Sequence, residues 1–286
     1  MINTKINKYS DLGYVVLKDF WNADEINNFH NSFNDLLQMQ LNKIGLLDSS
    51  RSYLNVEDSI QSLSVLLEKS NRNAFNQVIA MQREMYLNTM TLFNKKDLIN
   101  ISSELLKCSE LRLKIHQDGC LVNFPKNLTR LYRYHAEQHY YPYRRNFLNV
   151  WFPLVSNKTP KNGTMSIRPK GHLRDYSQFS EFSGFSSVSS KKDGSLSESE
   201  TFYQLDIPDI DMKNLEVLPM EINVGDLVFF HQNMPHTSTV NNSSQPSFAY
   251  ILRIYDFTND RTLSNNNGVK RYTTDAAQNG FINFNI

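Results

Sequence analysis

The sequence predicts an α+β chain whose core is a jelly-roll, a cupin-like double-stranded β-helix barrel, with a helical N-terminal elaboration. Apolar residues recur at helical spacing up to about residue 110. Beyond it they alternate with polar residues over short runs separated by Asn, Gly, Pro and Lys turns. The 40% apolar content of the 286 residues can fill one core. We therefore expect a single domain over 1–286, mainly helical over 1–110, with the jelly-roll over 111–260 and a C-terminal tail over 261–286.

The N-terminal part opens with a short strand and an amphipathic helix. The run Gly13–Leu17 contains Tyr and two Val residues, which favour a strand. Asn22, followed three residues later by Glu25, is a capping-box pattern, so we expect a helix to begin there. The apolar residues that follow have helical spacing: Ile26, Phe29, Phe33, Leu36 and Leu37. A second helical pattern extends from Val56 to about Leu106.

Six later runs predict the strands of the barrel. They are Leu128–His135, Phe147–Leu154, Thr164–Arg168, Glu216–Ile222, Asp226–His231 and Phe248–Asp256. Short antiparallel strands of this kind, with the helices gathered at one end of the chain, indicate a jelly-roll.

The segment Tyr176–Asp211 does not follow the strand pattern. It contains SQFSEFSGFSSVSSKKDGSLSESE, in which branched apolar residues are few, so we expect a long mobile loop over residues 176–211. Loops of this length inside compact domains are often functional. Phe179, Phe182 and Phe185 are spaced to form a short amphipathic turn that closes over a pocket. A lid and an ordinary surface excursion both fit this pattern.

Charge and cysteine content narrow the possible partners. The formal net charge is +1 with acids and bases interspersed, so no basic face indicates nucleic acid. Cys108 and Cys120 lack metal-binding spacing and are too few for a disulfide framework. No apolar run approaches the roughly 18 residues of a membrane span, and no signal-peptide core is present. We expect a cytoplasmic protein that acts on a small molecule, and no heptad pattern selects an oligomeric state.

Two imidazoles and one carboxylate are the candidate metal ligands. His135 and Glu137 lie two residues apart at the end of a predicted strand, where both side chains point to the same face. His236 comes just after GDLVFFHQNMP, a predicted strand that starts at a Gly-Asp turn, and can return a third ligand to the barrel mouth. Two histidines and one carboxylate form the facial triad of non-haem Fe(II) sites, which leaves three metal positions for substrates and O2.

Other residues compete for these positions. His116 and Asp118 repeat the His-x-acid pattern, but a Gly-Cys turn follows them, which is a poor setting for a rigid pair of ligands. His231 lies inside the apolar run VFFH, where a hydrogen-bonded histidine near the core is expected. We therefore prefer the later His-x-acid pair together with His236.

These residues belong to a longer pattern. In chain order it comprises His135-Ala136-Glu137, Tyr140-Tyr141-Pro142, Trp151-Phe152-Pro153-Leu154, Asn162-Gly163 and Pro169-Lys170-Gly171-His172. These motifs, with the opening DLGYVVLKDFWNADEI and the later GDLVFFHQNMPHTS, resemble the phytanoyl-CoA dioxygenase family of Fe(II)- and 2-oxoglutarate-dependent oxygenases. The resemblance covers about residues 9–256, in the family's order.

The resemblance implies roles for individual residues. His135, Glu137 and His236 would bind iron. Ser238 would hydrogen-bond the co-substrate 2-oxoglutarate, and Trp151 would wall the cavity. Iron would bind the keto acid and O2, and decarboxylation to succinate would accompany hydroxylation of the substrate. Candidate substrate contacts are Tyr140, Tyr141 and Arg144.

Two positions depart from the family pattern. Glu137 replaces the usual aspartate, which adds a methylene but keeps the charge and the oxygen donor. Ser247 replaces an arginine that usually follows the distal histidine by eleven residues and pairs with the distal carboxylate of 2-oxoglutarate. A buried carboxylate without a cation is costly. Arg253, on the same strand face as Ser247, is our first candidate for a relocated anchor. The other candidates are Arg133, Arg144, Arg145 and Arg168.

The expected activity is hydroxylation of a small or medium-sized organic substrate. A different class is a catalytically silent jelly-roll module that binds a carbohydrate-like ligand with Tyr140, Tyr141 and Tyr143. A mere binder has no need of three converging ligands, although the absent arginine is consistent with it. An iron oxygenase that does not use the keto acid is a third class. Halogenases of related type lack the carboxylate ligand, so Glu137 favours hydroxylation.

Overall fold

The computed structural model describes residues 2–43, 92–126, 131–140, 146–153, 155–174, 176, 180–190 and 196–259. Its helices are α1 (Ile2–Leu12), α2 (Ala23–Lys43), α6 (Lys96–Leu106) and α7 (Glu137–Tyr140), with short 3-10 turns at Glu110–Arg112, Gly171–Leu173, Asp209–Met212 and Phe257–Asn259. Its strands are β1 (Tyr14–Leu17), β2 (Leu113–Asn123), β3 (Phe147–Pro153), β4 (Met165–Ile167), β5 (Ser180–Ser190), β6 (Leu196–Asp206), β7 (Leu218–Pro219), β8 (Leu227–His231), β9 (His236–Ser238) and β10 (Ser247–Asp256).

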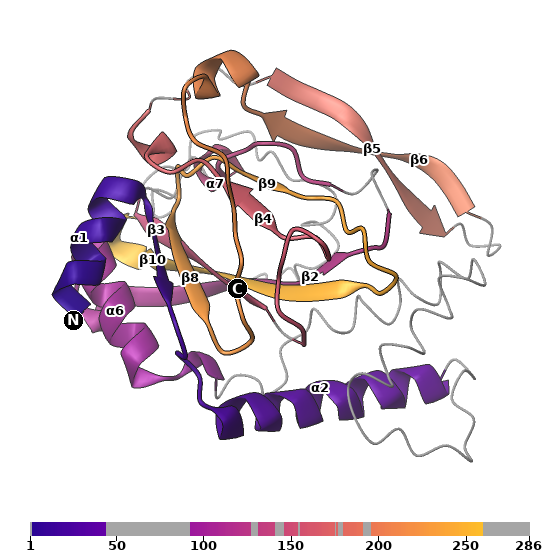
Figure 1. The fold of residues 1–286 in the computed structure, drawn as a ribbon, viewed down its shortest axis with the longest axis horizontal. Helices are drawn as coiled ribbons and strands as arrows, with labels where there is room; N and C mark the ends of the chain where they lie inside the picture. Colours follow the sequence, from indigo (N-terminus) through magenta and orange to yellow (C-terminus); the bar gives the residue numbers. More distant parts are fainter. Residues whose placement is uncertain are drawn as a thin grey trace, which may run out of the picture.

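The larger sheet has the strand order β1-β8-β3-β10-β2, and every pair in it is antiparallel. One face of this sheet packs against the helices. The alternate residues of β3 on this face share a buried cluster with residues of α2 and α6: Leu148, Val150 and Phe152 with Phe33 and Leu98. Figure 1 shows α2 and α6 on this side of the sheet.

The other face of the larger sheet packs against a smaller antiparallel sheet of order β7-β4-β9. Trp151 of β3 and Ile251 of β10 form one buried cluster with Met165 and Ile167 of β4, so the two sheets enclose a common interior. Two facing antiparallel sheets with helices on the outside confirm the predicted α+β jelly-roll.

The helix α1 was not predicted, but the two N-terminal elements that follow it form where they were expected. The strand expected at Gly13–Leu17 is β1, and α2 follows Asn22. The backbone N–H of Asn22 donates to Glu25 Oε2 at 2.8 Å, and the N–H of Glu25 donates to Asn22 Oδ1 at 2.9 Å. These reciprocal bonds are the capping box. The part of the second helical pattern before residue 92 lies outside the described residues.

The Ser-rich segment is not the loop that we expected. Residues 180–190 and 196–206 form the antiparallel pair β5 and β6, in which Phe185 lies opposite Phe202. Pairing uses backbone groups, which serine supplies as well as any residue, and Thr201-Phe202-Tyr203 adds a run with high strand propensity. Figure 1 places this hairpin on the side of the barrel that holds β4, β9 and α7, away from α2. A role as a lid stays a prediction.

The strand expected over Leu128–His135 is also wrong within the described residues. Residues 131–134 form no strand, and His135 makes only a single bridge, to His236. Conversely, His116 and Asp118 do lie in a strand, β2, which pairs with β10 across a register shift. The backbone of His116 and Asp118 is therefore part of a regular strand, contrary to our prediction.

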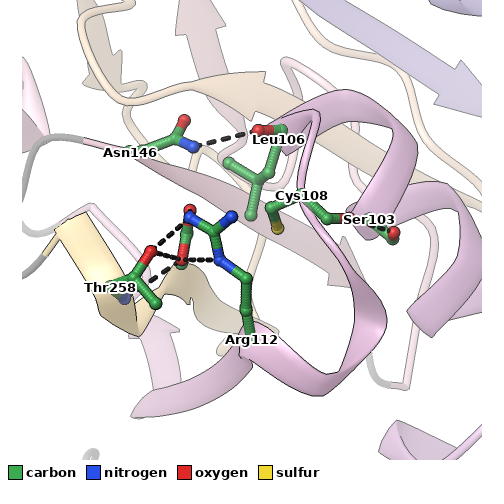
Figure 2. Close-up of polar contacts among 7 residues, drawn as sticks. Ser103, Leu106, Cys108, Arg112, Asn146 and Thr258 are labelled. Atoms are coloured by element: carbon green, nitrogen blue, oxygen red, sulfur yellow. Dashed lines mark hydrogen bonds and ion pairs between the residues drawn. The ribbon is translucent and has the colours of Figure 1, made fainter.

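Polar contacts hold the last residues of β10 at the end of this interior strand (Figure 2). The Arg112 Nε donates to Asp256 Oδ1 at 3.0 Å, and its Nη2 also contacts Asp256 Oδ2. Asn146 Nδ2 donates to the carbonyl of Leu106 at 2.9 Å, which joins the start of β3 to the end of α6. The contacts of Arg112 with Asp256 fix the end of β10, the strand that carries Arg253.

Candidate metal centre

His135 and His236 are joined backbone to backbone. The N–H of each residue donates to the carbonyl of the other at 3.0 Å, and the centroids of the two rings lie 4.1 Å apart. His236 begins β9, and Glu137 is the first residue of α7 rather than the third residue of a strand. Our prediction that His135 and Glu137 share a strand face is thus wrong, yet the turn into α7 brings the same two side chains together.

The tautomers of the two histidines follow from their hydrogen bonds. The Nδ1 of His135 lies 2.7 Å from the carbonyl oxygen of Arg133, and the Nδ1 of His236 lies 2.9 Å from that of Met234. A carbonyl oxygen only accepts, so each Nδ1 must carry a proton and donate. In a neutral imidazole this leaves the lone pair on Nε2, which is the atom that faces the partner ligands.

The two Nε2 atoms converge on one carboxylate oxygen. Glu137 Oε1 lies 3.8 Å from His135 Nε2 and 3.6 Å from His236 Nε2. The three ligand atoms lie within 4.8 Å of one another, and all three side chains are buried. Metal–ligand bonds of about 2.1 Å fit a set of this size. Two neutral imidazoles and one carboxylate suit divalent iron in particular, so the residues fit the predicted metal.

Arg253 holds the other oxygen of the same carboxylate. Its Nη2 lies 2.5 Å from Glu137 Oε2, and both side chains are about 5% exposed. Burial lowers the pKa of Arg253 to about 9, which still leaves the guanidinium charged at neutral pH. Burial by itself raises the pKa of Glu137, but in acid, when the Nε2 atoms of His135 and His236 carry protons, hydrogen bonds and charge from these rings outweigh burial and lower that pKa to about 2. The carboxylate is therefore ionised, and its Oε1 is directed at the two imidazoles.

The pKa of His236 is also lowered. Burial is the main cause, and the neighbouring His135 adds to it, while the contact with Glu137 acts in the opposite direction. A neutral imidazole is the form that binds a metal, so this shift favours ligation.

His231, the alternative to His236, belongs to another group of residues. Its ring lies 5.1 Å from that of His172 and 6.3 Å from that of Tyr9, and its Nδ1 accepts the backbone N–H of Asn233 at 3.0 Å. Burial, followed by the charge of His172, lowers the pKa of His231 to about 4. The structure thus places His236, and not His231, beside the other two candidate ligands.

Asn149 is a buried residue of this region that the sequence analysis missed. It lies on β3, directly opposite Arg253 of β10 and Phe230 of β8, and it is fully buried. Neither its side-chain nitrogen nor its side-chain oxygen has a hydrogen-bond partner. Buried amides are normally satisfied, so this one is available to a ligand. The signal in the sequence was a single polar residue inside the apolar run FLNVWFP.

The remaining predicted residues are placed as follows. Trp151 is 4% exposed and faces the barrel interior. Ser238 lies two residues after His236, on the same strand face, and is half-buried. Arg168 stacks on Tyr134 with 4.6 Å between its guanidinium carbon and the ring centroid, and its Nη1 donates to the carbonyl of Leu215. Tyr141, Arg144 and Arg145, together with the side chain of Tyr140, lie outside the described residues.

A profile of the phytanoyl-CoA dioxygenase family matches residues 9–248, which is most of the chain. The chain belongs to this family. The match contains all three candidate metal ligands, together with Ser247, where the family pattern has an arginine. Comparison with curated proteins finds no match.

Solved structures share the fold at low sequence identity. The non-heme alpha-ketoglutarate (2-oxoglutarate) dependent carbocyclase SnoK from nogalamycin biosynthesis is 18% identical, with a TM-score of 0.54 over 88% of this chain and 83% of its own. The epimerase SnoN, in complex with Fe3+, alpha-ketoglutarate and nogalamycin RO, is 12% identical, with a TM-score of 0.51 over 89% and 83%. EctD from S. alaskensis, with 2-oxoglutarate and 5-hydroxyectoine, is 14% identical, with a TM-score of 0.55 over 90% and 76%.

These neighbours show the fold, and they agree with the iron and 2-oxoglutarate predicted from the sequence. They also show that one fold hosts a carbocyclase and an epimerase, so the fold does not identify the reaction. Among the helices in the described part of the chain, none is long and apolar enough to cross a bilayer.

Proposed function

We propose that this protein is an Fe(II)- and 2-oxoglutarate-dependent oxygenase that hydroxylates a small or medium-sized organic molecule. The observation that supports this most is the buried set of His135, Glu137 and His236, in which both Nδ1 atoms bind backbone carbonyls and both Nε2 atoms face one carboxylate oxygen. A merely structural cluster does not need both imidazoles in the same tautomer with their lone pairs directed to one point.

Glu137 offers the metal one oxygen only. Because Arg253 binds Oε2 at 2.5 Å, Oε1 is the atom left to face His135 and His236. A carboxylate that binds through a single oxygen takes one metal position, so the two imidazoles and Glu137 would hold the ion with three ligands and would leave positions for the co-substrate and O2. The longer side chain of glutamate, compared with aspartate, allows contact with both the metal position and Arg253.

When bound, iron and 2-oxoglutarate together activate O2, with loss of CO2 and formation of succinate. The protein's own residues would hold iron and the co-substrate, exclude water from them and orient the substrate. His135, Glu137 and His236 are only 4–6% exposed, so bulk water is largely excluded from them. Asn149 supplies a buried amide beside this group, suited to hydrogen-bond an oxygen of the co-substrate or the substrate.

We assign the substrate side to the segment after Glu137. Tyr140, Tyr141 and Arg144 follow this ligand within seven residues, so they lie close to it along the chain and can contact a molecule bound at the metal. Two tyrosines and an arginine suit a polar organic substrate, since they combine ring faces with hydrogen-bond donors. Hydroxylation, rather than halogenation, is proposed because Glu137 provides the carboxylate that halogenases of related type lack.

The decisive experiment is an anaerobic titration of the Fe(II)-loaded protein with 2-oxoglutarate. Bidentate chelation of the keto acid should produce a weak visible charge-transfer band, and admission of O2 should then release succinate. His236→Ala should bind no iron and show no band, whereas the matched variant His231→Ala should retain both. If iron binds and no band develops, 2-oxoglutarate is not the co-substrate. If iron does not bind to the unmodified protein, the oxygenase proposal is wrong and the alternative of a catalytically silent binding module is favoured.

A further inference from the structure

Position 247, where the family pattern has an arginine, does not coincide with the position of Arg253 on β10. Ser247 is the first residue of β10 and faces the barrel interior with Ala249 and Ile251. Arg253 faces the same interior six residues further along, about 20 Å away at the rise of an antiparallel strand. Arg253 also contacts a candidate metal ligand, Glu137. Arg253 is therefore toward the metal end of β10, and Ser247 is at the other end of this strand.

A lysine reaches the position of the missing arginine. Lys158 Nζ donates to Ser247 Oγ at 2.6 Å and lies 3.3 Å from the carbonyl oxygen of Gly163. Ser247 Oγ in turn donates to the carbonyl of Asn162 at 2.6 Å, so its single proton is used there and its lone pair is turned toward Lys158. The serine thus fixes the position of the ammonium group.

Lys158 is held inside the barrel by its backbone. Its N–H donates to the carbonyl of Ile222 at 2.8 Å, and the N–H of Ile222 donates back at 3.0 Å. Residues paired in this way point their side chains to the same side, and Ile222 belongs to the interior cluster between the two sheets. Lys158 is only 3% exposed. Lysine is rarely buried to this degree, and an anion beside a buried ammonium offsets its cost of desolvation.

The spacing between Lys158 and the metal centre suits a five-carbon dicarboxylate. His236 pairs with Ile167, Ser238 pairs with Met165, and Gly163 comes two residues before Met165. Gly163 lies just before β4, so the level of His236 and that of Gly163 are four residues apart, at most about 13 Å if the chain is extended there. A five-carbon chain, with bonds of about 1.5 Å, spans roughly 6 Å. A metal–oxygen bond and a hydrogen bond at its ends add about 5 Å. Ser238, the predicted co-substrate contact, lies between the two ends.

We propose that the ammonium group of Lys158 binds the distal carboxylate of 2-oxoglutarate, in place of the family's arginine at position 247. This inference rests on the proposed function. Ser247 has a positioning role, because it orients Lys158 and is small enough to leave room for the carboxylate. Arg253 keeps its place against Glu137, where it orients a metal ligand.

The test compares two keto acids on the Fe(II)-loaded protein under anaerobic conditions. 2-Oxoglutarate and 2-oxopentanoate have the same five-carbon keto-acid chain, but only the first has a distal carboxylate. The charge-transfer band reports the dissociation constant of each. The unmodified protein should bind 2-oxoglutarate about 100-fold more tightly, as expected for one buried charged contact. Lys158→Met should remove most of this preference by weakening 2-oxoglutarate alone, with affinities for 2-oxopentanoate and iron unchanged.

Three further variants complete the test. Lys161→Met changes an exposed lysine of the same segment and should leave the preference intact. Lys158→Met with Ser247→Arg restores the family's cation and should recover at least part of it. Arg253→Met should weaken both keto acids together, through the metal.

The outcomes separate the two proposals. If neither keto acid produces a band in the unmodified protein, the proposed function fails, and the role of Lys158 fails with it. If the band forms but the preference survives Lys158→Met in a protein that melts normally, only the role of Lys158 is wrong. Loss of the preference in Arg253→Met instead would assign the carboxylate to Arg253.

Discussion

Strand β10 takes part in two arginine–carboxylate pairs in which both carboxylates are buried and only the exposure of the arginine differs. Arg253 binds Glu137 where both side chains are about 5% exposed. Asp256, three residues later, binds Arg112, whose side chain is 39% exposed. Asp256 is also saturated locally, since it accepts the backbone N–H and the hydroxyl of Thr258 (Figure 2). Glu137 has one oxygen on its arginine, and the other faces two imidazoles.

The difference between the two pairs shows how a buried ion pair can orient a metal ligand rather than stabilise the fold. At the end of β10, Asp256 links the strand to Arg112 and Thr258, and solvent at the partly exposed arginine weakens the ion pair. In the interior, the pair of Arg253 and Glu137 would be a poor way to stabilise the fold, because desolvation of the two charges cancels much of their attraction. Its value lies in fixing one carboxylate oxygen beside His135 and His236. The following predictions test this contrast, from the largest expected effect to the smallest.

Glu137→Gln should have the largest effect. The amide lacks the negative charge that a divalent ion needs, and Arg253 is left buried beside a neutral group. Iron affinity should fall at least 100-fold, and the free energy of unfolding of the metal-free protein should fall by about 3 kcal/mol. Metal titration and urea unfolding measure these changes. The control Asp256→Asn should keep iron affinity, and equal loss in both variants would contradict the contrast.

The second-largest effect should be a loss of folding stability at acidic pH. The pKa of Glu137 is lowered from 4.5 to about 2, so the native state binds fewer protons on this group than the unfolded state. Its contribution is present above pH 4.5 and is lost as pH falls toward 2, with a total of a few kcal/mol. Urea unfolding of the metal-free protein across this pH range measures it. Glu137→Gln should flatten the curve in this window. An unchanged slope in that variant would show that Glu137 is not the group that titrates.

Arg253→Met should have a smaller effect on the metal. Without the guanidinium, Oε2 of Glu137 becomes free to rotate or to bind the metal as a second oxygen. Loss of a partner that orients a ligand typically costs 10- to 100-fold in metal affinity, so we expect about 10-fold at neutral pH. Anaerobic Fe(II) titration measures this change. Unchanged affinity would remove Arg253 from the metal centre.

Arg112→Met should have the smallest effect. The arginine is partly exposed, and Thr258 keeps two of the hydrogen bonds to Asp256. The loss of stability should be at most about 1 kcal/mol, with iron and 2-oxoglutarate affinity unchanged. Thermal unfolding and the charge-transfer titration check both expectations. A measurable change in metal affinity would mean that the end of β10 and the metal centre are coupled along this strand.

The sequence predicted the parts of the fold that follow from local periodicity. The strands β3, β8 and β10 alternate or run apolar, and α2 begins at a capping box, so their pattern and their structure agree. The β5–β6 hairpin was not predicted, because backbone pairing of a Ser-rich segment leaves little signal in side-chain hydrophobicity.

The site was predicted in its residue types and not in its arrangement. The proximity of His135, Glu137 and His236 agreed with the motif, although Glu137 reaches the site from the start of a helix. Lys158 was missed because it lies in SNKTPKNG, a sequence typical of an exposed turn. Its burial depends on pairing with Ile222, which is 64 residues away in the chain, and no local pattern reports such a contact.

The two backbone hydrogen bonds between His135 and His236 determine how the metal centre gains and loses its ion. Because each residue donates to the other at 3.0 Å, the two imidazoles cannot separate without breaking both bonds. The carbonyls that hold the two Nδ1 atoms belong to residues two positions earlier in the same segments. The centre is therefore assembled by folding rather than by the ion. Iron can therefore leave and bind again without unfolding of the barrel, because the three ligands keep their alignment in the metal-free protein.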